Sequence, residues 1–120
     1  MPDEPISWDH LKKREPTQAD RDTLRAELVD RAVTVRRDGW ADHRDTWTAG
    51  DAAGVAYLLG DTAVLEELEE PEGSVLTRYA GSLYGFNGAR KDITAGLVGT
   101  QAWFDSARKE LDSRSPRTAE

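Results

Sequence analysis

The sequence predicts an all-α fold, a compact single-domain bundle of five or six short helices. Apolar residues recur at spacings of three and four in several segments, and no stretch alternates apolar and polar residues as a half-buried strand would. Cap-forming residues and glycines separate these segments. A chain of 120 residues can build one core without disulfides or metal ions. We therefore expect residues 1–120 to form one helical domain, with disordered tails at 1–5 and 112–120.

Composition excludes several classes of protein. The absence of cysteine removes disulfides, thiolate nucleophiles and Cys-ligated zinc. The chain has 16 basic and 23 acidic residues, and its formal net charge of −7 repels phosphate backbones at long range. No apolar run is long enough to cross a bilayer, so we expect a soluble, cytoplasmic protein that does not associate with membranes. Frequent arginine, alanine, glycine, aspartate and valine have GC-rich codons, which points to a high-GC bacterium or its phage.

The first third of the chain predicts two helices. A short helix is expected to begin at Ser7 and to end before Pro16, because proline cannot continue the hydrogen-bond ladder. Thr17 then caps the longest helix, at about 18–38, and Asp20 is placed to complete a capping box. The apolar face of this long helix contains Leu24, Leu28, Ala32 and Val35.

The helix at about 49–59 is expected to lie at the centre of the bundle. Thr48 is its predicted N-cap and Gly60 its predicted left-handed stop. Alanines and glycines give this helix little side-chain bulk, so neighbouring helices can approach it closely. Before it, Trp40 and Trp47 are seven residues apart, and a helical turn between them would direct both indoles toward the core.

The second half predicts two more breaks, each followed by helical sequence. Ser74 is expected to cap a helix after a turn at Pro71. Residues 84–88, Tyr-Gly-Phe-Asn-Gly, predict a tight loop, because glycine and Asn-Gly tolerate positive φ angles. Thr100 is expected to cap the last helix, whose apolar face ends at Leu111.

No motif in the sequence assigns a cofactor or a metal site. The glycines never precede the Lys-Ser or Lys-Thr of a phosphate loop, and the acidic residues do not alternate as in a calcium loop. A helix-turn-helix centred on Gly60 is disfavoured, because its second helix would carry four glutamates that DNA repels. We therefore expect no cofactor and no metal ion.

Three functions remain open. The preferred one is a non-enzymatic protein that mediates protein–protein interaction as an adaptor, regulator or inhibitor. A nucleic-acid-binding regulator that uses the cluster of Arg31, Arg36 and Arg37 is one alternative, although the net charge disfavours it. A small enzyme with His43 as general base is the other, since Asp42 and Asp45 flank this histidine, but no nucleophile is recognisable nearby.

Two segments are candidates for a contact surface. An acidic run at 66–72 is expected near a helix C-terminus, where the helix dipole disfavours negative charge, and this placement favours a partner with a basic surface. The aromatic loop and the basic pair after it form the second candidate. The helix faces rich in small residues are also compatible with a homodimer. The predicted interaction residues are Glu66, Glu67, Glu69, Glu70, Tyr84, Phe86, Arg90 and Lys91.

Overall fold

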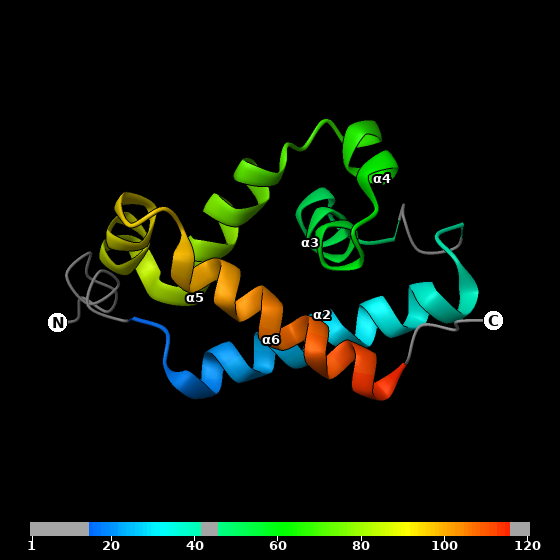
Figure 1. Cartoon of the computed structure of the whole chain (residues 1–120), viewed down its shortest axis with the longest axis horizontal. Coiled ribbons are helices and arrows are strands. Elements are labelled where there is room, and N and C mark those ends of the chain that lie inside the picture. Colours follow the sequence, from blue (N-terminus) through cyan, green and yellow to red (C-terminus); the bar gives the residue numbers. More distant parts are fainter. Residues whose placement is uncertain (1–14, 42–45, 116–120) are drawn as a thin grey trace, which may run out of the picture.

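The computed structural model describes residues 15–41 and 46–115. All of the regular secondary structure in these ranges is α-helix. The all-α bundle predicted from the sequence is confirmed, and Figure 1 shows how its helices cross one another. None of the helices in these ranges is long and apolar enough to cross a membrane. The helices are α2 (Gln18–Asp38), α3 (Ala49–Leu59), α4 (Thr62–Glu67), α5 (Glu72–Thr94) and α6 (Val98–Arg114).

Helix α2 has the bounds that its caps predict. The Thr17 hydroxyl accepts a hydrogen bond from the Asp20 N–H at 3.1 Å, and the Asp20 carboxylate accepts one from the Thr17 N–H at 2.8 Å. This capping box satisfies two donors at the start of the helix. At the other end, Gly39 takes a positive φ of 82° and its N–H donates to the Val35 carbonyl. The short helix expected to begin at Ser7 lies outside the described residues.

Helix α3 is the centre of the bundle, in contact with every other helix that the structure describes. The Thr48 hydroxyl caps it by accepting from the Asp51 N–H at 3.1 Å, and Gly60 ends it with φ 73° and ψ 26°. A methyl group on Gly54 would lie 2.0 Å from the Tyr79 hydroxyl oxygen, so α5 approaches α3 as closely as a glycine allows. Packing at this contact buries the phenol, and burial raises the pKa of Tyr79 to about 12.

One carboxylate organises the junction between α3 and α4. Asp61 Oδ1 accepts from the Val64 N–H at 3.2 Å and so caps α4, while Asp61 Oδ2 accepts from the Trp40 indole Nε1–H at 2.9 Å. Trp40 and Trp47 meet edge to face with their ring centroids 6.4 Å apart, and both are half-buried against the core. His43 lies outside the described residues.

Helix α5 corrects two expectations. It begins at Glu72, with Pro71 at the N-cap position, and Ser74 is not its cap. The break predicted at 84–88 is present, but it is a kink at one residue instead of a loop, since only Gly85 leaves helical geometry, with φ 78°. A single glycine can absorb the change of direction because it accepts positive φ. The kink divides α5 into a first arm, 72–84, and a second arm, 86–94, which run in different directions in Figure 1.

The kink exposes a carbonyl that α2 satisfies. Arg21 Nη1 donates to the Leu83 carbonyl oxygen and to that of Pro16, at 3.2 Å in each case. A methyl group on Gly85 would lie 3.3 Å from Pro16 Cδ, so the start of the described chain packs directly on the bend. The break predicted from Gly85 is therefore a corner held by α2.

Helix α6 also differs from prediction at both ends. It begins at Val98, so Thr100 lies in its first turn, and the N-cap position belongs to Leu97 in a left-handed conformation. The carboxylate of Asp92 on α5 accepts from the N–H groups of Gly99 and Thr100, both at 2.9 Å. At the other end α6 continues through residues 112–114, inside the expected C-terminal tail, because long-range ion pairs hold this turn.

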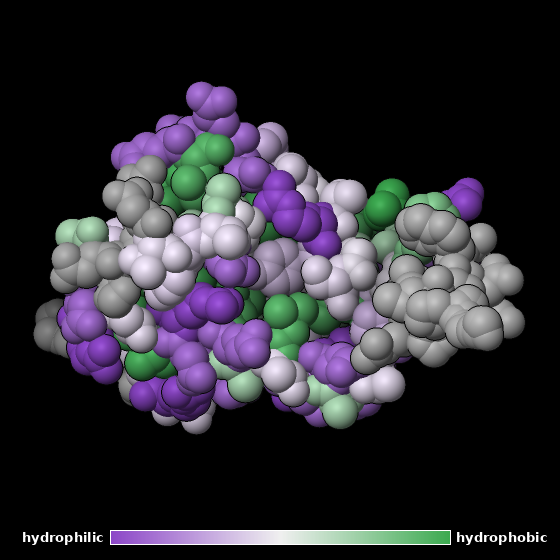
Figure 2. Space-filling model, turned by 180° about the vertical axis from the view of Figure 1, so that it is seen from behind, coloured by the Kyte–Doolittle hydropathy of each residue, from purple (hydrophilic) through white to green (hydrophobic). Residues whose placement is uncertain are grey.

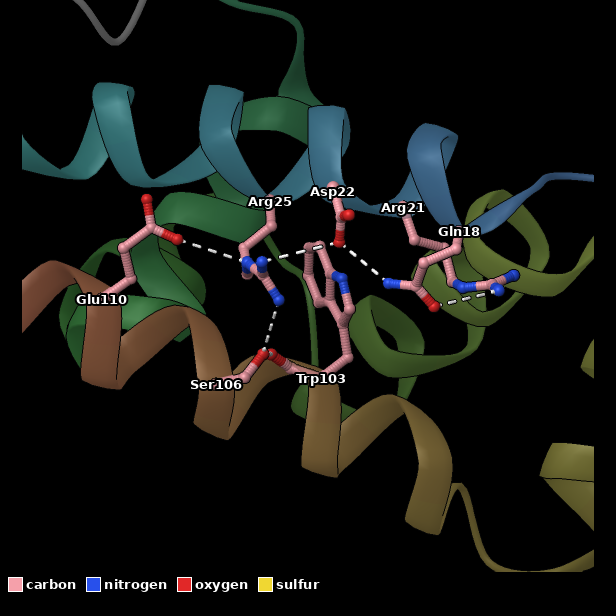
Figure 3. A network of polar contacts seen from close by, with 7 residues as sticks. All are labelled: Gln18, Arg21, Asp22, Arg25, Trp103, Ser106 and Glu110. Atoms are coloured by element: carbon pink, nitrogen blue, oxygen red, sulfur yellow. Dashed lines mark hydrogen bonds and ion pairs between the residues drawn. The ribbon is translucent and has the colours of Figure 1, made fainter.

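The polar face between α2 and α6 is a connected network, which Figure 3 shows. Arg25 lies 3.2 Å from the Glu110 carboxylate and 3.5 Å from that of Asp22, and it donates to the Ser106 hydroxyl at 3.4 Å. Behind it the Trp103 indole is buried, and its Nε1–H has no hydrogen-bond partner in the described structure. Trp103 belongs to an aromatic cluster in the core with Tyr57, Tyr79 and Phe104.

Candidate functional site

The acidic run at 66–72 is divided between two helix ends. Glu66 and Glu67 lie in the last turn of α4, where the helix dipole disfavours them. Glu70 and Glu72 lie at the start of α5, where the positive end of the dipole stabilises them. The expectation that the whole run meets a helix C-terminus is therefore wrong for its second half, because a new helix begins at Glu72.

The turn between α4 and α5 is tight and contains a strained residue. Glu69 has φ 58°, in the left-handed region that non-glycine residues rarely adopt. The Glu69 N–H donates to the Glu66 carbonyl and the Glu70 N–H to the Leu65 carbonyl, both at 3.0 Å. These bonds close the end of α4 in the manner usually reserved for glycine. Pro71 follows in extended geometry and starts α5.

A hollow of about 390 Å³ opens at this turn. Its exposed surface is mostly apolar, and glutamates from both helix ends surround it. Such a combination accommodates an apolar group and attracts a positive charge beside it. The residues that line the hollow are Thr62, Leu65, Glu66, Glu69, Glu70, Pro71 and Glu72.

The four glutamates of the hollow are not equivalent. Arg78 Nη2 lies 3.0 Å from both carboxylate oxygens of Glu70, and the Ser74 hydroxyl donates to the same carboxylate at 3.2 Å. The side chain of Glu70 is only 16% exposed, so its charge is neutralised inside the protein. No basic side chain of the described residues pairs with Glu66, Glu69 or Glu72, and these three carboxylates remain available to a cation from outside.

The negative charge beside the hollow also acts on Tyr57, which lies on the neighbouring helix α3. Burial raises the pKa of the Tyr57 phenol, and the negative charge of Glu72 raises it further. The Arg108 guanidinium lies over the same ring, 6.0 Å from its centroid, and donates to the Leu58 carbonyl at 3.1 Å. A cation thus stabilises the C-terminus of α3 next to the acidic surface.

The second predicted contact segment spans the kink of α5, with Tyr84 at the end of the first arm and Phe86, Arg90 and Lys91 on the second. Tyr84 is half-buried under Arg21, whose guanidinium is 5.7 Å from the ring centroid. Burial raises the pKa of Tyr84, and the negative charge of Asp92 adds to this. Phe86 differs from Tyr84, since it is 76% exposed, and the Arg90 guanidinium lies over its ring, 5.8 Å from the centroid. Tyr84 is therefore part of the packing, and Phe86 is part of the surface.

Phe86 belongs to a larger exposed patch. It is one of the large hydrophobic residues that stay exposed in the described structure, together with Ile93 at 44% and Val98 at 61%. Phe86, Arg90 and Ile93 are spaced by four and three residues, so they share one face of the second arm. Arg90 and Lys91 beside them have no ion pair with any described carboxylate. Figure 2 shows hydrophobic residues at the surface over this end of the molecule, among hydrophilic ones.

The two predicted contact segments do not form one surface. The first arm of α5 lies between them and is about 20 Å long at 1.5 Å per residue. Figure 1 places α4 near one end of this arm and residues 86–94 at the other. Both segments could be identified in the sequence, but the hollow could not. Thr62 and Leu65 line it together with the glutamates only because of how α4 and α5 are placed.

The arginine cluster on α2 is paired within the protein. Arg31 lies 3.8 Å from Asp51 and 6.0 Å from the Trp47 ring centroid, and Arg37 lies 3.0 Å from Asp38. Arg36 lies 3.0 Å from Asp112 and also donates to the Ser115 carbonyl. Arg21, which contacts the α5 kink, lies about 24 Å along α2 from Arg37 at 1.5 Å per residue. The structure therefore does not join these arginines to Arg90 and Lys91 in one positive patch.

The remaining chemical candidates give no site. His43 and its flanking aspartates lie outside the described residues, so their arrangement is not addressed. No group of three or more histidine, aspartate or glutamate side chains in residues 15–41 and 46–115 is placed to hold a metal ion. Comparison of the chain with protein-family models, with curated proteins and with solved structures finds no match.

Proposed function

We propose that this protein is a non-enzymatic interaction module whose α4–α5 hollow binds a segment that presents an apolar side chain flanked by cations. The observation that carries the proposal is the apolar hollow surrounded by Glu66, Glu69 and Glu72, three carboxylates without a basic partner in the described structure. Adaptors, regulators and inhibitors all act through such contacts.

The pairing of Glu70 with Arg78 supports the choice of a cationic partner. Arg78 Nη2 already lies 3.0 Å from both oxygens of the Glu70 carboxylate, a charge-assisted contact between a guanidinium and this surface. A second guanidinium or ammonium group from outside would find the other three carboxylates without a basic partner in residues 15–41 and 46–115. The hollow between them would take the apolar side chain.

The apolar contact and the ion pairs should contribute unequally to the binding free energy. Burial of one large apolar side chain contributes about 1.5–3 kcal/mol, whereas each exposed ion pair contributes about 0.2–1 kcal/mol. The apolar anchor therefore supplies most of the affinity, and the carboxylates select which anchor is accepted. The same reasoning predicts that binding weakens as salt is added.

The test uses a synthetic amphipathic helix with leucines on one face and lysines on the other. Fluorescence anisotropy of the labelled peptide measures binding to the full chain and to the single variants Glu66→Gln, Glu69→Gln and Glu72→Gln. Each substitution is expected to weaken binding about twofold to fivefold, the worth of one exposed ion pair. A peptide with glutamates in place of the lysines is expected not to bind.

Glu27→Gln is the matched control, since Glu27 is exposed on α2 and distant from the hollow in sequence. It changes the net charge equally but is expected to leave the affinity unchanged. Equal weakening by all four variants would show attraction to the net negative charge alone and would overturn the proposal. So would a wild-type chain that fails to bind the lysine peptide.

A further inference from the structure

We propose that the occupant of the α4–α5 hollow is a second copy of this chain, which inserts Phe86 together with Arg90 and Lys91. This inference rests on the proposed function, because it names the partner of the same hollow. The segment around Phe86 has the chemistry that the hollow requires, namely an apolar side chain next to two cations.

The inserted side chain is already presented to solvent. Phe86 is 76% exposed, and the guanidinium of Arg90, one helical turn away, lies over its ring. Lys91 is exposed on the same arm. Ordinary monomers rarely expose a phenylalanine next to further apolar residues without a contact to make, and Ile93 extends this patch along the same face.

The charges of the two sites are complementary. Glu66, Glu69 and Glu72 have no basic partner among the described residues, and Arg90 and Lys91 have no acidic one. A contact between the two sites pairs three carboxylates with two cations around a buried ring. The hollow is large enough for a phenyl ring, since pockets from about 300 Å³ upward hold whole small molecules.

One copy cannot fill its own hollow, because the first arm of α5 separates the two sites by about 20 Å. Two copies with their first arms side by side and antiparallel would place each Phe86 at the other copy's hollow. This two-fold arrangement makes the same contact twice and closes into a dimer. Both hollows and both Phe86 side chains are then occupied.

The first arm has a surface suited to such an approach. Gly73, Thr77 and Gly81 recur every fourth residue, and all three are exposed. A methyl group on Gly73 or Gly81 would meet no atom within 4 Å, so this stripe faces open space. Small residues at this spacing let two helices pack closely, which the antiparallel arrangement requires.

Sedimentation velocity over a range of concentrations tests the proposal. The wild-type chain is expected to show a concentration-dependent dimer. Phe86→Ala is expected to raise the dissociation constant at least about tenfold, the loss expected for one buried apolar side chain. Gly81→Gln is expected to weaken the dimer as well. It replaces an exposed glycine inside a helix by a better helix former, so the monomer should stay folded.

Charge reversal gives the sharpest outcome. The double variants Glu66→Lys/Glu69→Lys and Arg90→Glu/Lys91→Glu should each be monomeric when alone. Mixed together they should form a heterodimer, because the reversed hollow of one copy meets the reversed cations of the other. Circular dichroism of each variant confirms that it is folded, and Glu27→Gln serves as the unaffected control.

The outcomes separate this inference from the proposed function. A wild-type chain that stays monomeric at high concentration but still binds the leucine–lysine peptide overturns the second copy as occupant and leaves the hollow as a binding site. A chain that neither dimerises nor binds the peptide overturns both. A dimer that persists in both charge-reversed variants places the interface elsewhere and also overturns the inference.

Discussion

The indole N–H of Trp40 donates to the carboxylate of Asp61 at 2.9 Å, and the other oxygen of that carboxylate caps helix α4. Trp40 follows α2 and Asp61 follows α3, so one side chain joins the ends of two helices to the start of a third. Because α4 contributes Thr62, Leu65 and Glu66 to the hollow, this junction also positions the candidate interaction site.

Asp61→Ala should therefore lower the free energy of unfolding by about 1–3 kcal/mol, through loss of a helix cap and an unpaired indole donor. Trp40→Phe removes only the indole bond and should cost less. Urea denaturation followed by circular dichroism measures both. If Asp61→Ala is neutral, the carboxylate does not hold the junction.

Gly54→Ala and Gly81→Ala should have opposite effects on stability. At Gly54 the new methyl group would lie 2.0 Å from the Tyr79 hydroxyl oxygen and 2.6 Å from Cζ of the same ring, so α3 and α5 must separate. Overpacking of this kind costs about 1–3 kcal/mol. At Gly81 the methyl group meets open space, and the gain in helix propensity is about 0.5–1 kcal/mol.

Thermal unfolding of the two alanine variants measures this difference, with the wild type as reference. A stabilising Gly54→Ala would mean that Tyr79 can move aside without cost. The conclusion that small residues on α3 let its neighbours approach would then be wrong.

Asp92 should give the protein part of its stability against acid. Burial works against ionisation of this carboxyl, but hydrogen bonds from the Thr100 hydroxyl and from the N–H groups of Gly99 and Thr100 outweigh it and lower the pKa of Asp92. A pKa lowered in the folded state gives stability that is present above the ordinary pKa of about 4 and is lost as the pH falls through the folded value.

Asp92→Asn is expected to lower the free energy of unfolding at pH 7 by about 0.5–2 kcal/mol, the worth of a helix cap. Below about pH 4 the difference from the wild type should shrink, because the wild-type carboxyl is then being protonated as well. Urea titrations between pH 2 and pH 7 measure both curves. Parallel curves across this range would contradict the role of the ionised carboxylate.

Glu69 combines backbone strain with a place beside the hollow, and two substitutions separate these contributions. Glu69→Gly relieves a residue held at φ 58° and should raise the free energy of unfolding by up to about 1 kcal/mol. Glu69→Gln keeps the side-chain size and the strain, and should leave stability nearly unchanged. Both remove the carboxylate, so both should weaken peptide binding, as measured by anisotropy and by thermal melting of the same samples.

Local signals determined much of the fold. The Thr17 and Asp20 capping box, the Thr48 cap and the Gly60 stop all act within four residues, so the bounds of α2 and α3 follow from neighbouring residues alone. The apolar spacing on these helices then places their inner faces. The acidic run at 66–72 is likewise visible in the sequence as one of two segments without an obvious internal function.

Tertiary structure decided what depends on distant partners. The bend at Gly85 frees the Leu83 carbonyl, and Arg21 donates a hydrogen bond to it. Arg21 lies sixty-two residues before Leu83 in the sequence. The start of α6 moved to Val98 because the Asp92 carboxylate reaches its first N–H groups from the preceding helix. No sequence pattern around these residues predicts either contact.

The candidate site shows the same division. Its glutamates can be read from the chain, but their roles cannot, since Arg78 neutralises Glu70 while Glu66 and Glu69 have no basic partner among the described residues. The hollow itself lies at the left-handed turn at Glu69, which brings the end of α4 and the start of α5 to the same place. Short-range hydrogen bonds and periodicity determined α2 and α3 by themselves, whereas charge pairing and the concave surface were decided only when the helices packed.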